Sequence, residues 1–189
     1  MKFKEYIPLA IRTESSLNPF KKEVEERGLT ARLFHGIQGI ITEKDEFREA
    51  IKNNDNVNAL EEVGDMLWYL AIIADELNDN NFINEIEEIF NTDLIKSIEF
   101  DTILVNSFDN SKKTLFYGKE FDIDALKKDL LDLCYFIRDA TYDNSIELLM
   151  ISNIEKLSAR YPNKFTQVDA LQRDLKKERE ILERNLTSQ

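Results

Sequence analysis

Four acidic residues form two pairs with the same spacing, Glu43 with Glu46 and Glu62 with Asp65. Residues three apart lie on the same side of a helix, so each pair would point two carboxylates in one direction. Carboxylate oxygens suit Mg²⁺ or Mn²⁺, and Mg²⁺ commonly shares the phosphate oxygens of a substrate. The spacing therefore predicts a Mg²⁺ site, with Mn²⁺ as the alternative ion, that serves a nucleotide polyphosphate.

The surroundings of the acids carry more weight than their spacing. With 37 acidic residues in 189, roughly seven such pairs are expected by chance, as is usual for short motifs. However, residues 60–77 are largely apolar and contain no Lys or Arg, and Lys44 and Arg48 lie off the face of the first pair. Buried carboxylates without a partner cost several kcal/mol each. A metal ion is therefore the simplest partner.

The elements that carry these acids are predicted to be helices. Apolar residues recur at helical spacing in residues 33–47 and 57–77, and the polar stretch KNNDNVN separates the two segments. We therefore predict an antiparallel hairpin over residues 30–80. Five Gly and three Pro offer few helix breaks, and we predict one all-α domain over 1–189, an antiparallel helical bundle. Further helices are expected at 20–35, 82–90, 92–110, 122–142, 145–160 and 167–185, with a stop at Pro162.

Residues 95–142 look like a faint echo of this hairpin. Asn106 and Asp109 would correspond to the first acidic pair, and Asp129 and Asp132 to the second. Two amphipathic hairpins can also resemble each other by coincidence, so a degenerate internal repeat and a chance likeness both stay open.

Composition limits the partners and the compartment. The net charge of −12 argues against duplex nucleic acid and anionic membranes, which both favour basic surfaces. No apolar run reaches the roughly 18 residues of a membrane span, no signal-like start is visible, and the single cysteine, Cys134, cannot form an internal disulfide. We expect a cytoplasmic protein in which Cys134 is an inert buried thiol.

The two acidic pairs, in TEKDEF and LEEVGDMLWYL, resemble the E-x-x-E and E-x-x-D signature of the all-α nucleoside triphosphate pyrophosphohydrolases of the MazG and dimeric dUTPase group. The resemblance implies the helical bundle of that group and conversion of a (deoxy)nucleoside triphosphate to the monophosphate and pyrophosphate. It also implies that Glu43, Glu46, Glu62 and Asp65 bind Mg²⁺. Glu43 and Glu46 would be catalytic, with Glu46 as the first candidate for the general base.

The stretch NIEKLSARYPNKFT is similar to the N-x-x-K-L-x-x-R-Y-P block of the same group, so residues 145–185 are expected to supply a nucleotide-contacting helix and a C-terminal helix. Lys156 and Arg160 would hold the β- and γ-phosphates, and Tyr161 could stack on the base. A solvated basic face is the alternative. The substrate-binding residues expected from the resemblance are Asn153, Lys156, Arg160, Tyr161, Lys164 and His35. For His35 a core or rim position is equally plausible, and for Trp68 core packing is favoured over base contact.

Two other functions stay open from the sequence. One is a nucleotide-binding regulatory or structural protein with weak or no turnover, and the other is a helical interaction module whose acids are ordinary surface charges. In many members of the resembled group the active bundle is completed across a dimer, so we also expect a homodimer.

Overall fold

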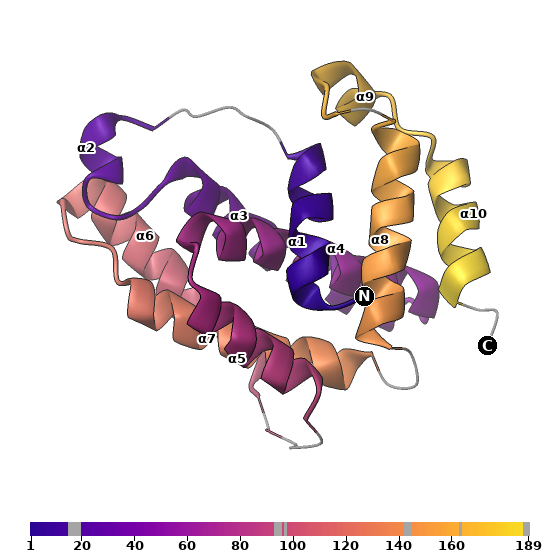
Figure 1. Cartoon of the computed structure of the whole chain (residues 1–189), viewed down its shortest axis with the longest axis horizontal. Helices are drawn as coiled ribbons and strands as arrows, with labels where there is room; N and C mark the ends of the chain where they lie inside the picture. Colours follow the sequence, from indigo (N-terminus) through magenta and orange to yellow (C-terminus); the bar gives the residue numbers. More distant parts are fainter. Residues whose placement is uncertain (15–19, 93–95, 97, 142–144, 163, 187–189) are drawn as a thin grey trace.

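The computed structural model describes residues 1–14, 20–92, 96, 98–141, 145–162 and 164–186. Within these ranges the chain forms helices and no strand, as predicted (Figure 1). The α-helices are α1 (Phe3–Ala10), α2 (Lys22–Glu25), α3 (Ala31–Lys52), α4 (Asn56–Leu77), α5 (Asn80–Phe90), α6 (Val105–Tyr117), α7 (Ile123–Ala140), α8 (Ile146–Arg160), α9 (Gln167–Leu171) and α10 (Leu175–Leu186), with 3₁₀ turns at Ile11–Thr13 and Phe100–Thr102.

The predicted hairpin is present as α3 and α4, which form the most extensive helix–helix contact in the described part of the chain. Side-chain caps define where both helices begin, because Thr30 accepts a hydrogen bond from the Leu33 amide and Asp55 accepts one from the Asn58 amide. The helices approach closely at Gly39, where an added Cβ would lie 2.2 Å from the Tyr69 ring. The small residues of α3 therefore serve close helix packing.

Helix α4 lies at the centre of the molecule and packs against α1, α3, α7, α8 and α10. Helix α1 is not among the elements expected from the sequence, although Phe3, Tyr6, Ile7 and Ala10 follow helical spacing and are buried in the core. It fills the space between α4, α5 and α8. The omission matters because α1 contributes hydrogen bonds to the site described below.

The segment expected to echo the hairpin forms α6 and α7, which pack against each other and contact α3 and α4 respectively. Its polar residues do not converge. Asp129 accepts two hydrogen bonds from Ser107, Asp132 pairs with Lys96, and Asp109 pairs with Lys112. A second carboxylate site is therefore absent from the described part of this segment.

Three of the expected helices differ from the structure. The helix at 92–110 is wrong, because Leu104 adopts a left-handed conformation with φ of 65° immediately before α6 begins; residues 93–95 and 97 lie outside the described ranges. The helix at 20–35 is interrupted around Gly28, whose φ is 87°. The one at 167–185 is interrupted between α9 and α10.

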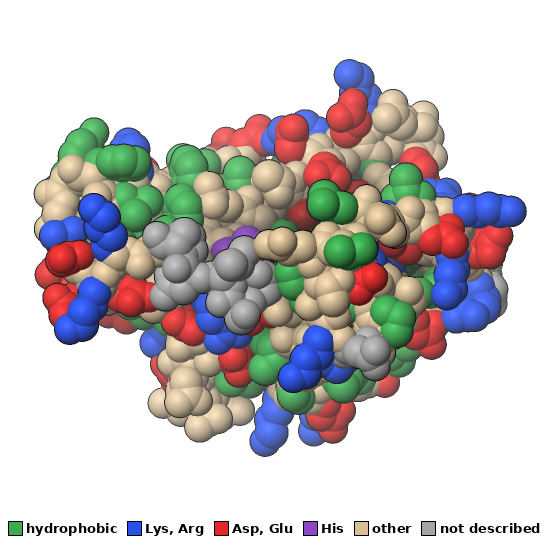
Figure 2. Space-filling model, turned by 90° about the horizontal axis from the view of Figure 1, so that it is seen from above, with side chains coloured by type: hydrophobic (Ala, Val, Ile, Leu, Met, Phe, Trp, Pro, Cys, Tyr) green, Lys and Arg blue, Asp and Glu red, His purple; other side chains and the backbone are tan. Residues whose placement is uncertain are grey.

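Two expectations about the surface and the core can be compared with the structure. Cys134 is buried and free, as expected. No helix in the described ranges is both long enough and apolar enough to cross a lipid bilayer. Despite the net negative charge, basic and acidic side chains alternate around the edge of the face in Figure 2.

Candidate active site

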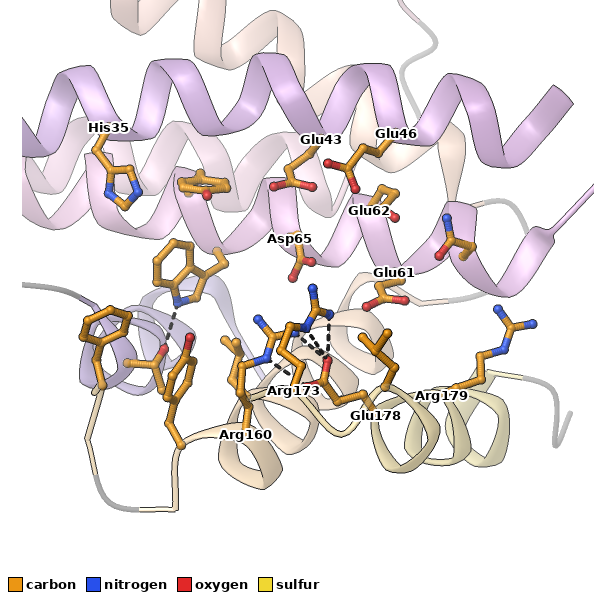
Figure 3. A pocket seen from close by; sticks show the side chains of 18 residues that line it. His35, Glu43, Glu46, Glu61, Glu62, Asp65, Arg160, Arg173, Glu178 and Arg179 are labelled. Carbon is orange, nitrogen blue, oxygen red and sulfur yellow. Dashed lines mark hydrogen bonds and ion pairs between the residues drawn. The ribbon is translucent and has the colours of Figure 1, made fainter. Parts of the chain in front are cut away.

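A pocket of about 600 Å³ is lined by residues of the α3–α4 hairpin on one side and of α8, α10 and the segment between them on the other. This volume falls within the range of ordinary small-molecule sites. Carboxylates from α3 and α4 line one wall, and arginines from α8, α10 and the segment before α10 line the opposite wall (Figure 3). The pocket therefore places acidic and basic groups on facing surfaces.

The acidic wall contains a tight group of three carboxylates. Glu43, Glu62 and Asp65 each place an oxygen within 4.8 Å of the others, and Glu62 is buried. The fourth predicted ligand, Glu46, lies one turn further along α3 and lines the same pocket but is exposed and outside this group. The structure thus brings together three of the four predicted metal ligands, with the fourth nearby.

Burial and crowding change the protonation of Glu43 and Glu62. Burial raises the pKa of Glu43 to about 9, and the neighbouring carboxylates of Asp65 and Glu62 add to the increase. Burial, followed by the charge of Asp65, raises the pKa of Glu62 to about 7. In the described part of the chain, no Lys or Arg pairs with Glu43, Glu46 or Glu62. Glu43 and Glu62 therefore hold at least one proton between them near neutral pH unless a cation is present.

Asp65 is different, because it has a basic partner that the sequence argument missed. The Nζ atom of Lys156 lies 2.7 and 2.6 Å from the two oxygens of Asp65 and 3.0 Å from Oε1 of Glu61. Burial alone would lower the pKa of Lys156, but the two carboxylates outweigh that effect and the pKa is raised. The absence of Lys and Arg from residues 60–77 was therefore a misleading guide, since the cation comes from α8.

Asn153 joins the same network on the side away from the pocket. Its Nδ2 donates to Asp65 Oδ1 over 2.7 Å, and its Oδ1 accepts from the Tyr6 hydroxyl over 2.8 Å. Asn153 and Lys156 are buried and absent from the pocket lining, whereas the resemblance predicts that they contact the nucleotide. In the structure they support Asp65 from behind.

The basic wall contains residues that sequence reasoning missed. Arg160 was expected there, and it lines the pocket with Arg173 and Arg179. Glu178, which is buried, accepts hydrogen bonds from both Arg160 and Arg173. Arg173, Glu178 and Arg179 all lie in the run QRDLKKERE. The mixed charges of this run are typical of a solvated helix. Only the packing of α10 against α8 identifies the residues that face the pocket.

One end of the pocket is aromatic. The exposed His35 ring packs edge-on against Tyr69 and Trp68, with centroid distances of 5.4 and 6.2 Å. The Trp68 Nε1 donates to the Ala10 carbonyl over 2.9 Å, which fixes the indole at the pocket wall. Tyr161 also lines this pocket.

Lys164 and Trp68 lie elsewhere than the sequence analysis predicted. Lys164 is exposed and does not line the pocket. Trp68 was expected in the core, yet it is only partly buried and borders the pocket while packing on the core cluster. The aromatic end is therefore formed by more residues than the sequence analysis assigned to it.

The donor set fits a hard divalent cation. Three carboxylates converge. The pKa values of Glu43 and Glu62 are raised, and Glu62 is buried. Ligands made only of oxygen suit Mg²⁺ and Mn²⁺. The protein can therefore offer the metal Glu43, Glu62 and Asp65, with Glu46 within the same pocket.

The fold and the pocket define an all-helical protein with a carboxylate site of the kind that binds divalent metals. Residues 35–101 match the family model of the MazG nucleotide pyrophosphohydrolase domain, so this part of the chain is MazG-like. The match includes all four predicted acids and α4 and α5, and it covers about a third of the chain. Searches of curated proteins and of solved structures gave no match. The block at 153–166 lies outside the matched range, so its similarity to the group remains a prediction.

Proposed function

We propose that the protein is a Mg²⁺-dependent pyrophosphohydrolase that converts a (deoxy)nucleoside triphosphate to the monophosphate and pyrophosphate. The observation that carries the proposal is the pocket itself, in which the carboxylates of Glu43, Glu62 and Asp65 face the basic wall. The match to the MazG nucleotide pyrophosphohydrolase domain supports the same reaction class. A cation on one wall and guanidinium groups on the other suit a polyphosphate between them.

The reaction is a displacement at the α-phosphorus. A water oxygen forms the new bond, the bond to the oxygen bridging to the β-phosphate breaks, and pyrophosphate leaves with that oxygen. Bound Mg²⁺ would offset the negative charge that grows on the phosphoryl oxygens. Glu46 is exposed in the pocket and has no basic partner among the described residues, so it is our choice to accept the proton of the attacking water.

The remaining residues bind and orient. Arg160 faces the acids across the pocket and is assigned to the departing phosphates. The aromatic end, with His35 and Tyr161, is assigned to the base. Lys156 and Asn153 are assigned to hold Asp65 in position rather than to contact the nucleotide, because both are buried behind it.

The test is pyrophosphate release in the presence of Mg²⁺ from the eight common ribo- and deoxynucleoside triphosphates plus dUTP. Glu62→Gln is compared with the parent, because it removes one buried charge from the site while keeping the side-chain size. Glu85→Gln makes the same change at an exposed position of α5 that lies outside this pocket. We expect activity on at least one nucleotide, its loss in Glu62→Gln and its retention in Glu85→Gln.

A thermal melt with and without Mg²⁺ separates the outcomes. Stabilisation by Mg²⁺ without pyrophosphate release from any nucleotide would refute the hydrolase and favour a nucleotide-binding regulator. No stabilisation and no release would mean that the carboxylates are not a metal site. Light scattering of the eluting protein measures the predicted homodimer independently of these results.

A further inference from the structure

Two arginines of the basic wall bind one buried carboxylate, Glu178. The Oε1 atom of Glu178 accepts a hydrogen bond from Arg160 Nε over 3.0 Å, and Oε2 accepts one from Arg160 Nη2 over 2.5 Å. The same Oε2 atom accepts from Arg173 Nη2 over 2.7 Å and from Arg173 Nε over 3.3 Å. One acid on the first turn of α10 therefore holds two guanidinium groups from different segments.

The charges of this triad do not balance. Glu178 needs one cation, and it has two, so the group carries a net charge of +1 at the pocket wall. The Glu178 side chain is only 4% exposed, whereas Arg173 is 40% exposed and borders the open pocket. A pair that served only to attach α10 to α8 would need Arg160 alone. The second arginine is thus surplus to helix packing and faces the space between the walls.

The orientation of the pair suits an anion. In Figure 3 the guanidinium groups of Arg160 and Arg173 lie between Glu178 and the pocket, on the side that faces Asp65 and Glu61. Each arginine uses the Nε and one Nη on Glu178. Arg160 also contacts the Tyr161 side chain, whereas the other Nη of Arg173 is left for a further acceptor. Phosphate oxygens match such forks in geometry and in charge.

We infer that Glu178 is a positioning residue that holds Arg160 and Arg173 as a paired clamp for the terminal phosphates of an anionic polyphosphate. The inference rests on the proposed function for the identity of the substrate, but it concerns Arg173 and Glu178, which neither the two sequence blocks nor the matched family segment includes. In this assignment Arg173 contacts the phosphates, and Glu178 acts only through the two arginines.

The test uses inorganic tripolyphosphate with Mg²⁺ as a probe that has no base or sugar, with its Kd measured by calorimetry on the full chain. Arg173→Gln removes one guanidinium, and we expect the Kd to rise about tenfold, the size of effect given by one charge-assisted hydrogen bond. Lys176→Gln makes the same charge change on α10 at a side chain that is 86% exposed and outside the pocket. We expect less than a twofold change there.

Glu178→Gln gives the most decisive result, because the loss of its charge and the loss of its positioning role would change the Kd for tripolyphosphate in opposite directions. Removing a negative charge beside the site should tighten binding of an anion if the arginines stay in place, whereas loss of positioning should weaken it. We expect a rise in Kd of about tenfold, together with a higher KM and a nearly unchanged kcat on any nucleotide that is hydrolysed. A thermal melt of each variant identifies the temperature range in which it is folded.

The clamp is overturned by an unchanged Kd in Arg173→Gln, and equally by an unchanged or lower Kd in folded Glu178→Gln. Arg173 is partly exposed, so its variant keeps the test decisive even if Glu178→Gln fails to fold. Failure of the proposed function looks different. Triad-dependent binding of tripolyphosphate without hydrolysis of any nucleotide supports the clamp and refutes the hydrolase, and hydrolysis with no effect of Arg173→Gln does the reverse.

Discussion

Replacing Lys156 by Met should destabilise the metal-free protein strongly. The lysine is 1% exposed, and its ammonium contacts both oxygens of Asp65 and one of Glu61. Methionine keeps the length and the packing of the stem but leaves two carboxylates without their cation. Removing one partner of a buried pair typically costs about 3–5 kcal/mol.

The structure narrows this range. The side chains of Asp65 and Glu61 are 24% and 14% exposed, so water recovers part of the loss. Protonation also sets an upper limit on the loss of stability from the unpaired aspartate, because this acid can take up a proton instead of staying charged. Neutralising an ordinary aspartate at pH 7 costs about 4 kcal/mol. We therefore expect a loss of about 3 kcal/mol at pH 7 in the free energy of unfolding. At pH 5 the proton costs only about 1.5 kcal/mol, so the deficit should fall by about half.

Urea denaturation with EDTA, followed by circular dichroism at both pH values, measures these differences. Lys176→Met is the control, because that side chain is 86% exposed and its loss should change stability by less than about 0.5 kcal/mol. In Lys156→Met combined with Asp65→Asn, part of the loss should be recovered, since the strongest uncompensated charge is gone. A deficit below about 1 kcal/mol at pH 7, or one that does not change with pH, would refute the reasoning.

Three further predictions concern the acids and the hairpin. Glu62→Gln should raise the melting temperature without Mg²⁺, because it removes a crowded buried charge, and should reduce the stabilisation by added Mg²⁺; a melt in which both quantities stay unchanged would contradict the metal site. Because the pKa of Glu43 is raised to about 9, protons compete with Mg²⁺, so the affinity should increase from pH 6 towards pH 9 with proton release; calorimetry in buffers of different ionisation enthalpy checks this, and an affinity independent of pH would count against it. Gly39→Ala would place a Cβ 2.2 Å from the Tyr69 ring and should destabilise the protein by about 1–3 kcal/mol. In Gly64→Ala the new Cβ would have its nearest neighbour at 3.5 Å, so this change should be neutral or stabilising by up to about 1 kcal/mol. Equal urea midpoints for the two variants would contradict the packing argument.

The hairpin was predictable because local signals agree with the packing. The apolar residues of 33–47 and 57–77 follow a helical period, and the polar run between them supplies Asp55 as the cap of α4. The convergence of Glu43, Glu62 and Asp65 then follows from two antiparallel helices in close contact. These features depend on residues near one another in sequence, which spacing alone can relate.

The missed features depend on contacts between distant segments. Lys156 neutralises Asp65 from 91 positions away, and Glu178 selects Arg160 across 18 positions. Spacing cannot reveal which of several charged residues on α8 and α10 turn inward, because a solvated face has the same composition. The helix expected at 92–110 failed for a local reason, since Leu104 adopts a left-handed conformation that nothing in its residue type favours.

The long-range bonds around Asp65 also bear on the order in which the molecule folds. Tyr6 and Asn153, which are joined by a hydrogen bond, are 147 positions apart. Contacts with such separation form late, because most of the chain must collapse before they can close. The α3–α4 hairpin needs only local contacts, so it can assemble while its acids still face water. The arrival of α8 then partly buries Asp65 and Glu61, and Lys156, the cation that makes this burial tolerable, is carried on the same helix.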